Sequence, residues 1–444
     1  MGLQHSRWLI KALSLAIFLF FGLVTASSWL SYDFFKEFIT PSTLLMAPDM
    51  LQSKAGAGIA TLASFNFAIG LIALLIFSIP VLVAAPKFLG LESSPKIALI
   101  ISTISLLYVG FLQHRFYHSE QEAFYQLSPI TFSHPAAYFI KSPFITSDLI
   151  QEKHLHAAKF FQKSVVKEEF PFLTISHAQP KIPNQKNVIV LFLESVRAAE
   201  TGFLSQQKGT TPNLDRIAQQ SLSFSNFYAN SSHTVRAEVA TLCSVLDMSS
   251  GAPLSRRGLA FNTPCLPNIL KKQGYRSLWY HGYTSEFYNR DQFHLQLGFD
   301  ELIDQRIIAN DKPEAISIGW GISDKDVLNY AFEDLSKRKA PFFAEILTLT
   351  NHFPFDNGFE KIAQEREDEN LVYNRYLRSI HYTDQALGEF WDNFQQSPLA
   401  ENTILIILAD HGLWMRSKHT EKANAYLRHE MQFKVPLLIW QKGI

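Results

Sequence analysis

The chain has 444 residues, of which 47% are hydrophobic, so it is long enough for a membrane part and one soluble domain with a sizeable core. Its 40 basic and 40 acidic residues cancel, and this balance gives no overall field that would attract nucleic acid. The 37 Phe and the low charged fraction of 18% are typical of a chain that places helices in lipid, and two cysteines exclude a Cys-rich zinc module or a disulfide scaffold.

Three apolar runs near the N-terminus predict membrane-spanning helices. Residues 12–32, 55–86 and 97–113 carry no charged side chain, and a crossing needs roughly 20 apolar residues. A secretory signal is the alternative for the first run, because Arg7 and Lys11 precede it and a small-residue segment follows at 26–28. The two later runs favour a transmembrane domain over residues 1–113.

The basic residues near the ends of these runs favour a cytoplasmic N-terminus, although the bias is slight. Arg7 and Lys11 would share one side with Lys87 and Lys96, while Lys36 and Lys54 oppose them. Three crossings then place everything after Gln113 outside the cytoplasm. We therefore expect a multi-pass protein of the inner (cytoplasmic) membrane with an extracytoplasmic or periplasmic catalytic domain.

Residues 114–185 have mixed polarity and are predicted to form a juxtamembrane linker. Within it, residues 148–167 show the apolar spacing of an amphipathic helix.

From residue 186 to 444 the pattern changes to short apolar strands separated by helices, which predicts an α/β domain with a mostly parallel sheet covered by helices on both faces. Four strands are expected at 188–193, 277–280, 343–349 and 403–408. Each is followed by polar residues, namely Glu194, His281, Asn351 with His352, and Asp410 with His411. Ligand sites of open α/β sheets lie beyond the carboxyl ends of the strands, so these side chains should converge.

Helices are expected between the strands at 213–221, 237–246, 266–273, 324–337 and 369–394. Thr211 and Ser323 are the predicted N-caps of the first and fourth, and Gly274 is a C-terminal cap for the third. A last strand is expected at 435–440.

Glu194, Asp410 and His411 provide oxygen and nitrogen ligands suited to a divalent metal. Solvated loop residues are the alternative interpretation of the same positions. The polar stretch 230–236 could supply a hydroxyl ligand that is also a nucleophile, and the helix after it would favour a bound phosphate. Taken by itself, this stretch could equally be an ordinary helix N-cap.

Several motifs together resemble the lipoteichoic acid synthase-like, phosphoglycerol transferase branch of the sulfatase and alkaline phosphatase superfamily. They are the run 187–194, Thr-Pro-Asn-Leu-Asp at 211–215, Asn-His-Phe-Pro-Phe at 351–355 and Ala-Asp-His-Gly at 409–412. The resemblance implies one divalent metal ion, with Mn first and Mg or Zn as alternatives, on Glu194, Thr234, Asp410 and His411. It implies binding of the donor phosphate and head group by His281, Tyr288, Arg290 and His352.

The resemblance further implies transfer of phosphoglycerol from a phospholipid to a glycan or lipid acceptor through a phospho-threonine at Thr234. Phosphatidylglycerol is the first donor, and a phosphoethanolamine transferase using phosphatidylethanolamine is the alternative. A sulfatase-type or phosphodiesterase hydrolase and a degenerate envelope sensor also stay open, although 234–236 lacks the Cys or Ser that a sulfatase converts to formylglycine.

Three features depart from the family pattern, and a fourth adds to it. Family members from Gram-positive bacteria usually have five membrane helices, and the position of Tyr288 is often Trp. The sequence stops soon after the last predicted strand, so we expect a fragment or a shortened member. A disulfide between Cys243 and Cys265 is expected from the oxidising exterior.

Overall fold

The structure is a computed structural model that describes residues 185–205, 209–245, 255, 265–355, 359–362, 371–413 and 430–443. The three predicted crossings, the linker and its amphipathic helix lie outside these residues. Among the residues described, no helix combines the length and the apolar character that crossing a bilayer requires.

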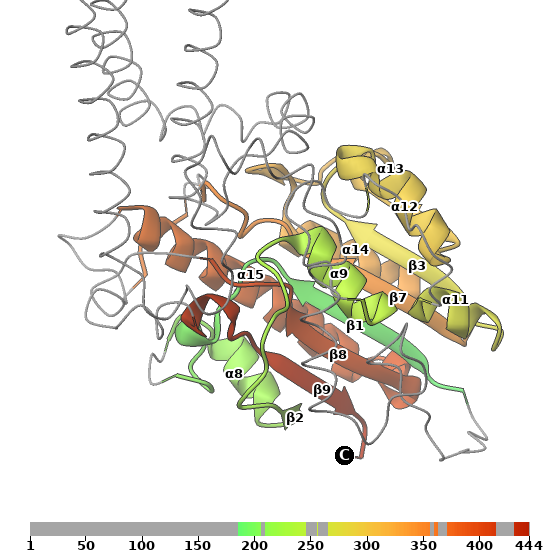
Figure 1. The fold of residues 1–444 in the computed structure, drawn as a ribbon, viewed down its shortest axis with the longest axis horizontal. Coiled ribbons are helices and arrows are strands. Elements are labelled where there is room, and N and C mark those ends of the chain that lie inside the picture. Colours follow the sequence, from blue (N-terminus) through green and yellow to red (C-terminus); the bar gives the residue numbers. More distant parts are fainter. Residues whose placement is uncertain are drawn as a thin grey trace, which may run out of the picture. The chain divides into compact units, whose positions relative to one another are not determined.

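The centre of the domain is a seven-stranded sheet in the order β2-β9-β8-β1-β7-β3-β4 (Figure 1). Its five consecutive strands from β8 to β4 are parallel, whereas β9 runs antiparallel to β8 and to β2. The strands are β1 (Asn187–Leu193), β2 (Leu222–Ser223), β3 (Arg276–His281), β4 (Glu301–Ile303), β7 (Phe342–Leu347), β8 (Thr403–Ala409) and β9 (Leu437–Gln441). A separate hairpin pairs β5 (Ser317–Ile318) with β6 (Gly321–Ile322).

Both faces of the sheet are covered, which is why the central strands are apolar almost throughout. Along β1, Ile189 and Leu191 pack into one core, whereas Val190 and Phe192 pack into another. Alternation of side chains along a strand therefore divides the interior into two layers.

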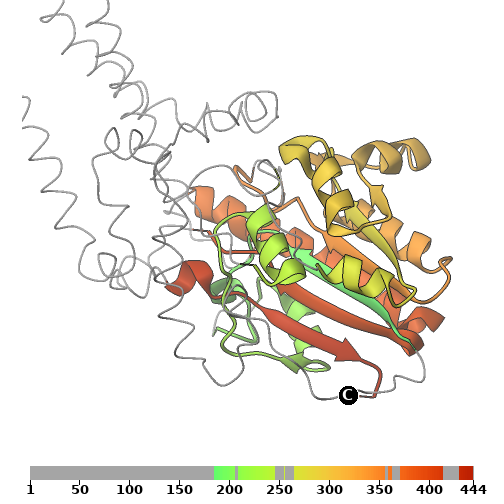
Figure 2. The same ribbon diagram turned by 45° about the vertical axis from the view of Figure 1, so that its right-hand side comes forward.

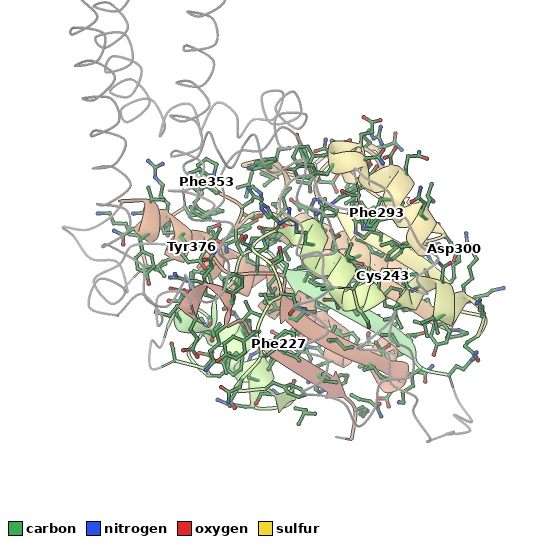
Figure 3. The ribbon with its side chains drawn as sticks, viewed as in Figure 1. Phe227, Cys243, Phe293, Asp300, Phe353 and Tyr376 are labelled. Carbon is green, nitrogen blue, oxygen red and sulfur yellow. A yellow bond between two sulfur atoms is a disulfide. The ribbon has the colours of Figure 1, made fainter. Side chains whose placement is uncertain are left out.

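The helices divide between these two layers (Figures 1 and 2). The first layer contains α8 (Pro212–Ala218), α13 (Gln305–Asp311), α14 (Asp324–Leu335) and α15 (Leu371–Gln396). The second contains α9 (Thr234–Cys243), α11 (Leu266–Lys271) and α12 (Arg290–Leu297). Figure 3 labels Cys243 on α9 and Phe293 on α12, which belong to the second core, and Tyr376 on α15, which belongs to the first. In the part of the chain that the structure describes, three short 3-10 helices complete the elements: η2 (Ala198–Glu200), η3 (Phe287–Asn289) and η4 (Pro398–Asn402).

The mixed α/β fold with a mostly parallel sheet agrees with the sequence prediction, and the predicted helices and strands are found with shifted ends. The main correction concerns α9, which begins at Thr234 and not at residue 237. The polar stretch before it suggested a loop, yet a Thr-Val-Arg turn is compatible with a helix once its apolar side packs on the sheet. The short elements β4, α12 and α13 were not predicted.

The two predicted N-caps differ in outcome. The Ser323 hydroxyl accepts a hydrogen bond from the Asp326 amide, so α14 is capped as expected. Thr211 occupies the N-cap position of α8 but makes no capping bond. Its hydroxyl instead donates to Asp215 Oδ1 at 3.3 Å, because that side chain folds back toward the start of the helix.

Candidate metal and phosphate site

Glu194 directly follows β1 and is held in place from several sides. Its carboxylate accepts a 2.6 Å hydrogen bond from the hydroxyl of Ser195, and its backbone carbonyl accepts one from Asn351 Nδ2 at 2.9 Å. Ser195 has a φ of 57°, a left-handed conformation that is uncommon for a residue other than glycine. Its amide donates to Asp410 Oδ1 at 2.8 Å. The turn after β1 therefore joins two carboxylates from different strands.

Asp410 and His411 follow β8, the neighbour of β1 in the sheet. The His411 Nδ1–H donates to the Gly412 carbonyl at 3.0 Å, which leaves Nε2 with a lone pair. Nε2 lies 3.3 Å from Asp410 Oδ2 and 3.8 Å from Glu194 Oε1. All three side chains are buried.

Thr234 completes this group. It is the first residue of α9, and its half-buried hydroxyl donates a hydrogen bond to Glu194 Oε2 at 3.1 Å and lies 3.4 Å from His411 Nε2. The positive end of the helix dipole lies at the same point, where it would stabilise negative charge on the oxygen or on a bound phosphate.

These four residues fit a divalent cation. One atom each from Glu194, Asp410 and His411 lies within 4.8 Å of the others. Among the described residues, Asp410 Oδ2 is buried without a hydrogen-bond partner, and the nearest ring nitrogen presents a lone pair to it. Two electron-pair donors facing each other in a dry site are unfavourable until a cation lies between them.

The electrostatics of the site also favour a bound cation. Burial opposes the ionisation of Glu194, but His352, His411 and the Ser195 bond outweigh it, and the pKa of Glu194 is lowered. Burial and the negative charge of Glu194 raise the pKa of Asp410 well above its ordinary value. Ionisation of both carboxyl groups in one shared site is energetically unfavourable without positive charge beside them.

A second group of predicted residues lies at the ends of β3 and α12. His281, the last residue of β3, has Nδ1 3.1 Å from the Leu347 carbonyl, so Nδ1 carries the proton. Its Nε2 then accepts a 3.2 Å hydrogen bond from Arg290 Nη1. Burial and the Arg290 charge lower the pKa of His281 to about 3. In this arrangement His281 holds the arginine and has no proton at Nε2 to give to a leaving group.

His352 follows β7 in the loop that also carries Asn351. Its Nδ1–H donates to the Phe353 carbonyl at 2.9 Å, and its ring lies 4.2 Å from that of Trp320. Burial lowers the pKa of His352, although Glu194 acts in the opposite direction. Tyr288 lies in η3 with a φ of 57°, and its ring packs 4.2 Å from Phe287.

Two glycines beside the site allow close backbone approach. A Cβ on Gly282 would lie 2.5 Å from the Ile322 carbonyl oxygen, and one on Gly412 would lie 2.3 Å from that of Gln432. Each follows a site histidine, so a larger residue would displace the turn that orients the imidazole.

Cys243 and Cys265 are joined by a disulfide, which links the end of α9 to the residue before α11. Both residues are buried in the second core.

Sequence reasoning missed the supporting residues Ser195, Asn351 as a partner of Glu194, and Glu238. Glu238 is fully buried and lies one helical turn after Thr234. A charged residue in the segment 237–243, which is otherwise apolar except for Thr241, was the signal that could have identified it.

Comparison with known proteins shows the family to which the domain carrying this site belongs. The sequence profile described as Sulfatase matches residues 186–444, more than half of the chain. The chain belongs to the Sulfatase family.

Among curated proteins, Lipoteichoic acid synthase 1 of Bacillus subtilis is 30% identical over 235 residues, covering 51% of this chain and 36% of that protein. The lipoteichoic acid synthase-like protein YvgJ of the same organism is 24% identical over 407 residues, covering 87% of this chain and 63% of that protein. The chain thus spans less than two thirds of the length of these relatives.

Two solved structures have the same fold as this family member. A protein in the alkaline phosphatase superfamily from Vibrio parahaemolyticus is 29% identical with a TM-score of 0.54, covering 66% of this chain and 69% of that one. The lipoteichoic acid synthase LtaP from Listeria monocytogenes is 23% identical with a TM-score of 0.52, covering 59% and 66%.

Proposed function

We propose that the chain is a metal-dependent phosphotransferase that moves phosphoglycerol from a phospholipid to a glycan or lipid acceptor through a phospho-threonine at Thr234. The observation that carries this proposal is the position of the Thr234 hydroxyl. It lies at the start of a helix, 3.1 Å from Glu194 and 3.4 Å from His411. The family and its lipoteichoic acid synthase relatives support the same reaction class.

In the first half of the reaction, Thr234 Oγ1 attacks phosphorus, the new O–P bond forms, and the bond from phosphorus to the diacylglycerol oxygen breaks. The proton lost by Thr234 ends on diacylglycerol. In the second half an acceptor hydroxyl attacks phosphorus, the threonine–phosphorus bond breaks, and the proton lost by the acceptor ends on Thr234.

We assign proton transfer to His352 and phosphate binding to Arg290, with Tyr288 contacting the head group. The His352 pKa is lowered, so at neutral pH its imidazole is neutral and its Nε2 can take up a proton and release it again. A guanidinium holds two phosphate oxygens at once. His281 keeps this guanidinium in place through its Nε2.

Glu194, Thr234, Asp410 and His411 would hold the divalent ion, with Mn as the first expectation and Mg or Zn as alternatives. When bound, the ion supplies positive charge that favours the ionised form of the Thr234 hydroxyl.

We further propose that residues 1–113 anchor the chain in the cytoplasmic membrane and that residues 186–444 work outside the cytoplasm. The three uncharged runs and the disulfide support this arrangement. Reporter fusions after Gln185 test it. Alkaline phosphatase should be active there, whereas activity of a cytoplasm-only reporter alone would contradict the topology.

The transfer reaction is tested by incubating the full chain with Mn²⁺ and labelled phosphatidylglycerol or phosphatidylethanolamine, and by following diacylglycerol release. An acid quench followed by peptide mass mapping should find phosphoglycerol on Thr234. Diacylglycerol release from phosphatidylethanolamine alone would identify this lipid, in place of phosphatidylglycerol, as the donor. No release from either lipid, with no adduct on Thr234, would refute the proposal. Thr234→Ser, which keeps a hydroxyl, is the matched control for the adduct.

A further inference from the structure

A network of charged side chains lies buried in the second core, behind the nucleophile. Glu238 is fully buried on α9, and its Oε2 accepts a hydrogen bond from Arg290 Nη2 at 3.1 Å. Its other oxygen, Oε1, lies 3.2 Å from His294 Nε2. His294 is also fully buried, and its Nδ1 lies 2.9 Å from the Arg290 backbone carbonyl oxygen. Glu238 therefore holds the Arg290 guanidinium directly, and His294 lies between the other Glu238 oxygen and the Arg290 backbone carbonyl.

Arg290 reaches the site with its guanidinium fixed between two partners. Nη1 donates to His281 and Nη2 to Glu238, while Nε is buried without a hydrogen-bond partner among the residues that the structure describes. Of these two partners, only Glu238 can balance the positive charge. Burial opposes the ionisation of Glu238, but the Arg290 charge and the His294 bond outweigh it and lower the pKa of Glu238 to about 2.

A second buried carboxyl group gives a natural contrast. Glu345 lies in β7, and one of its side-chain oxygens is within 4.8 Å of one Glu238 oxygen and of a His294 ring nitrogen. Burial and the charge of Glu238 raise the pKa of Glu345 well above its ordinary value. Of these two adjacent buried carboxyl groups, Glu238 has the hydrogen bond from Arg290, which favours its ionised form.

A buried ion pair adds little to stability by itself, because removing both charges from water costs about as much as their attraction returns. Its benefit lies in fixing geometry. Glu238 is four residues after Thr234 on the same helix, a rise of about 6 Å. A carboxylate at this position ties the arginine to the helix that carries the nucleophile.

We propose that Glu238 is a positioning residue that fixes the Arg290 guanidinium relative to the Thr234 hydroxyl. This inference rests on the proposed function, because it takes Arg290 as the phosphate-binding group. Glu238 itself does not touch the substrate. Its loss should therefore weaken phosphate binding and slow transfer without removing any group from the reaction.

The test compares Glu238→Gln with Glu345→Gln in the full chain. Both substitutions keep the shape of the side chain, but only the first replaces the carboxylate that accepts a hydrogen bond from Arg290. Glu238→Gln should raise the Kd for glycerol phosphate at least tenfold and lower kcat/KM for diacylglycerol release at least as much. Glu345→Gln should keep both quantities within about twofold, because the hydrogen bonds of the Arg290 guanidinium go to Glu238 and His281. Equal effects of the two variants, or no effect of Glu238→Gln, would overturn the proposal.

Two further measurements separate positioning from general damage. In a double-mutant cycle, Glu238→Gln combined with Arg290→Lys should cost little more than Arg290→Lys alone, and full additivity would count against the inference. If Glu238→Gln folds poorly, Glu238→Asp provides a second variant, because it keeps the negative charge but moves it away from Arg290. This variant should weaken glycerol phosphate binding while Tm stays near that of the wild type. A wild-type chain that neither binds glycerol phosphate nor releases diacylglycerol would refute the proposed function, which is a different outcome from equal Glu238 and Glu345 variants.

Discussion

Both layers of the domain contain buried charged residues, but two regions within them use different chemistry. Beneath α14 and α15 lies a cluster of aromatic side chains that includes Phe390, Trp391 and Phe394, all fully buried. Beneath α9 and α12, Glu238 and Arg290 lie among the apolar residues of the second core. The aromatic cluster stabilises the fold, whereas the network around Glu238 also orients a group that reaches the site.

The contrast has its origin in the kind of interaction that each of these two regions uses. Apolar burial is non-directional, so it stabilises a sheet without fixing any one side chain precisely. Hydrogen bonds between charged groups are directional, and in an interior without water a charged group that lacks a partner destabilises the fold. A region that must hold a threonine and an arginine at a fixed separation gains from the second kind of interaction. Changes in the two regions should therefore have different consequences.

The largest expected effect is at the nucleophile. Thr234→Ala should reduce diacylglycerol release on the order of a thousandfold or more, and adding Asp410→Ala should reduce it little further, because these residues act as a unit. Tm should stay close to that of the wild type. Near wild-type turnover by Thr234→Ala would show that the threonine is only a helix-end residue.

In the aromatic cluster, Phe390→Ala should lower the free energy of unfolding by about 3–5 kcal/mol, because it leaves a cavity where Phe390 packs against Phe332 and Phe394. Turnover per folded molecule should hardly change. Urea unfolding followed by circular dichroism gives the first quantity, and Phe390→Leu provides the milder control. A loss of turnover in fully folded Phe390→Ala would erase the contrast between the two regions.

Reduction of the Cys243–Cys265 disulfide tests how far the second layer depends on a covalent link. The two cysteines are separated by 22 positions, so loss of the link should cost about 3 kcal/mol in the chain-entropy model. The Cys243→Ser, Cys265→Ser protein should match the reduced wild type. Mass mapping after an alkylating quench gives the redox state, and two free thiols in freshly isolated protein would contradict the link.

The last expected effect is the pH dependence that His281 contributes. Its pKa is lowered to about 3, so the folded state favours the neutral ring. This contribution is complete above the unfolded value of about 6.5 and is lost as pH falls toward the folded value, with a slope of up to about 1.4 kcal/mol per pH unit. His281→Gln should flatten the unfolding free energy in this window. An unchanged slope of the unfolding free energy against pH would show that a different group titrates in this window.

The sequence alone determined the sheet and the residues at its edge. Mostly apolar strands with polar endings predicted a mostly parallel sheet and the convergence of Glu194, His281, His352 and Asp410, because carboxyl ends of parallel strands meet at one edge. The family motifs added Thr234 and Arg290. These features are local, since each depends on a run of a few residues and on the side chains directly after that run.

Only the tertiary structure decided which groups pair with one another. Ser195 orients Glu194 through a left-handed turn, and Glu238 holds Arg290 although 52 positions separate them. The second pairing leaves no periodic pattern in the sequence, because it depends on how α9 and α12 pack in the same layer. The raised pKa of Glu345 likewise results from burial beside Glu238, which becomes apparent only when the layers are packed.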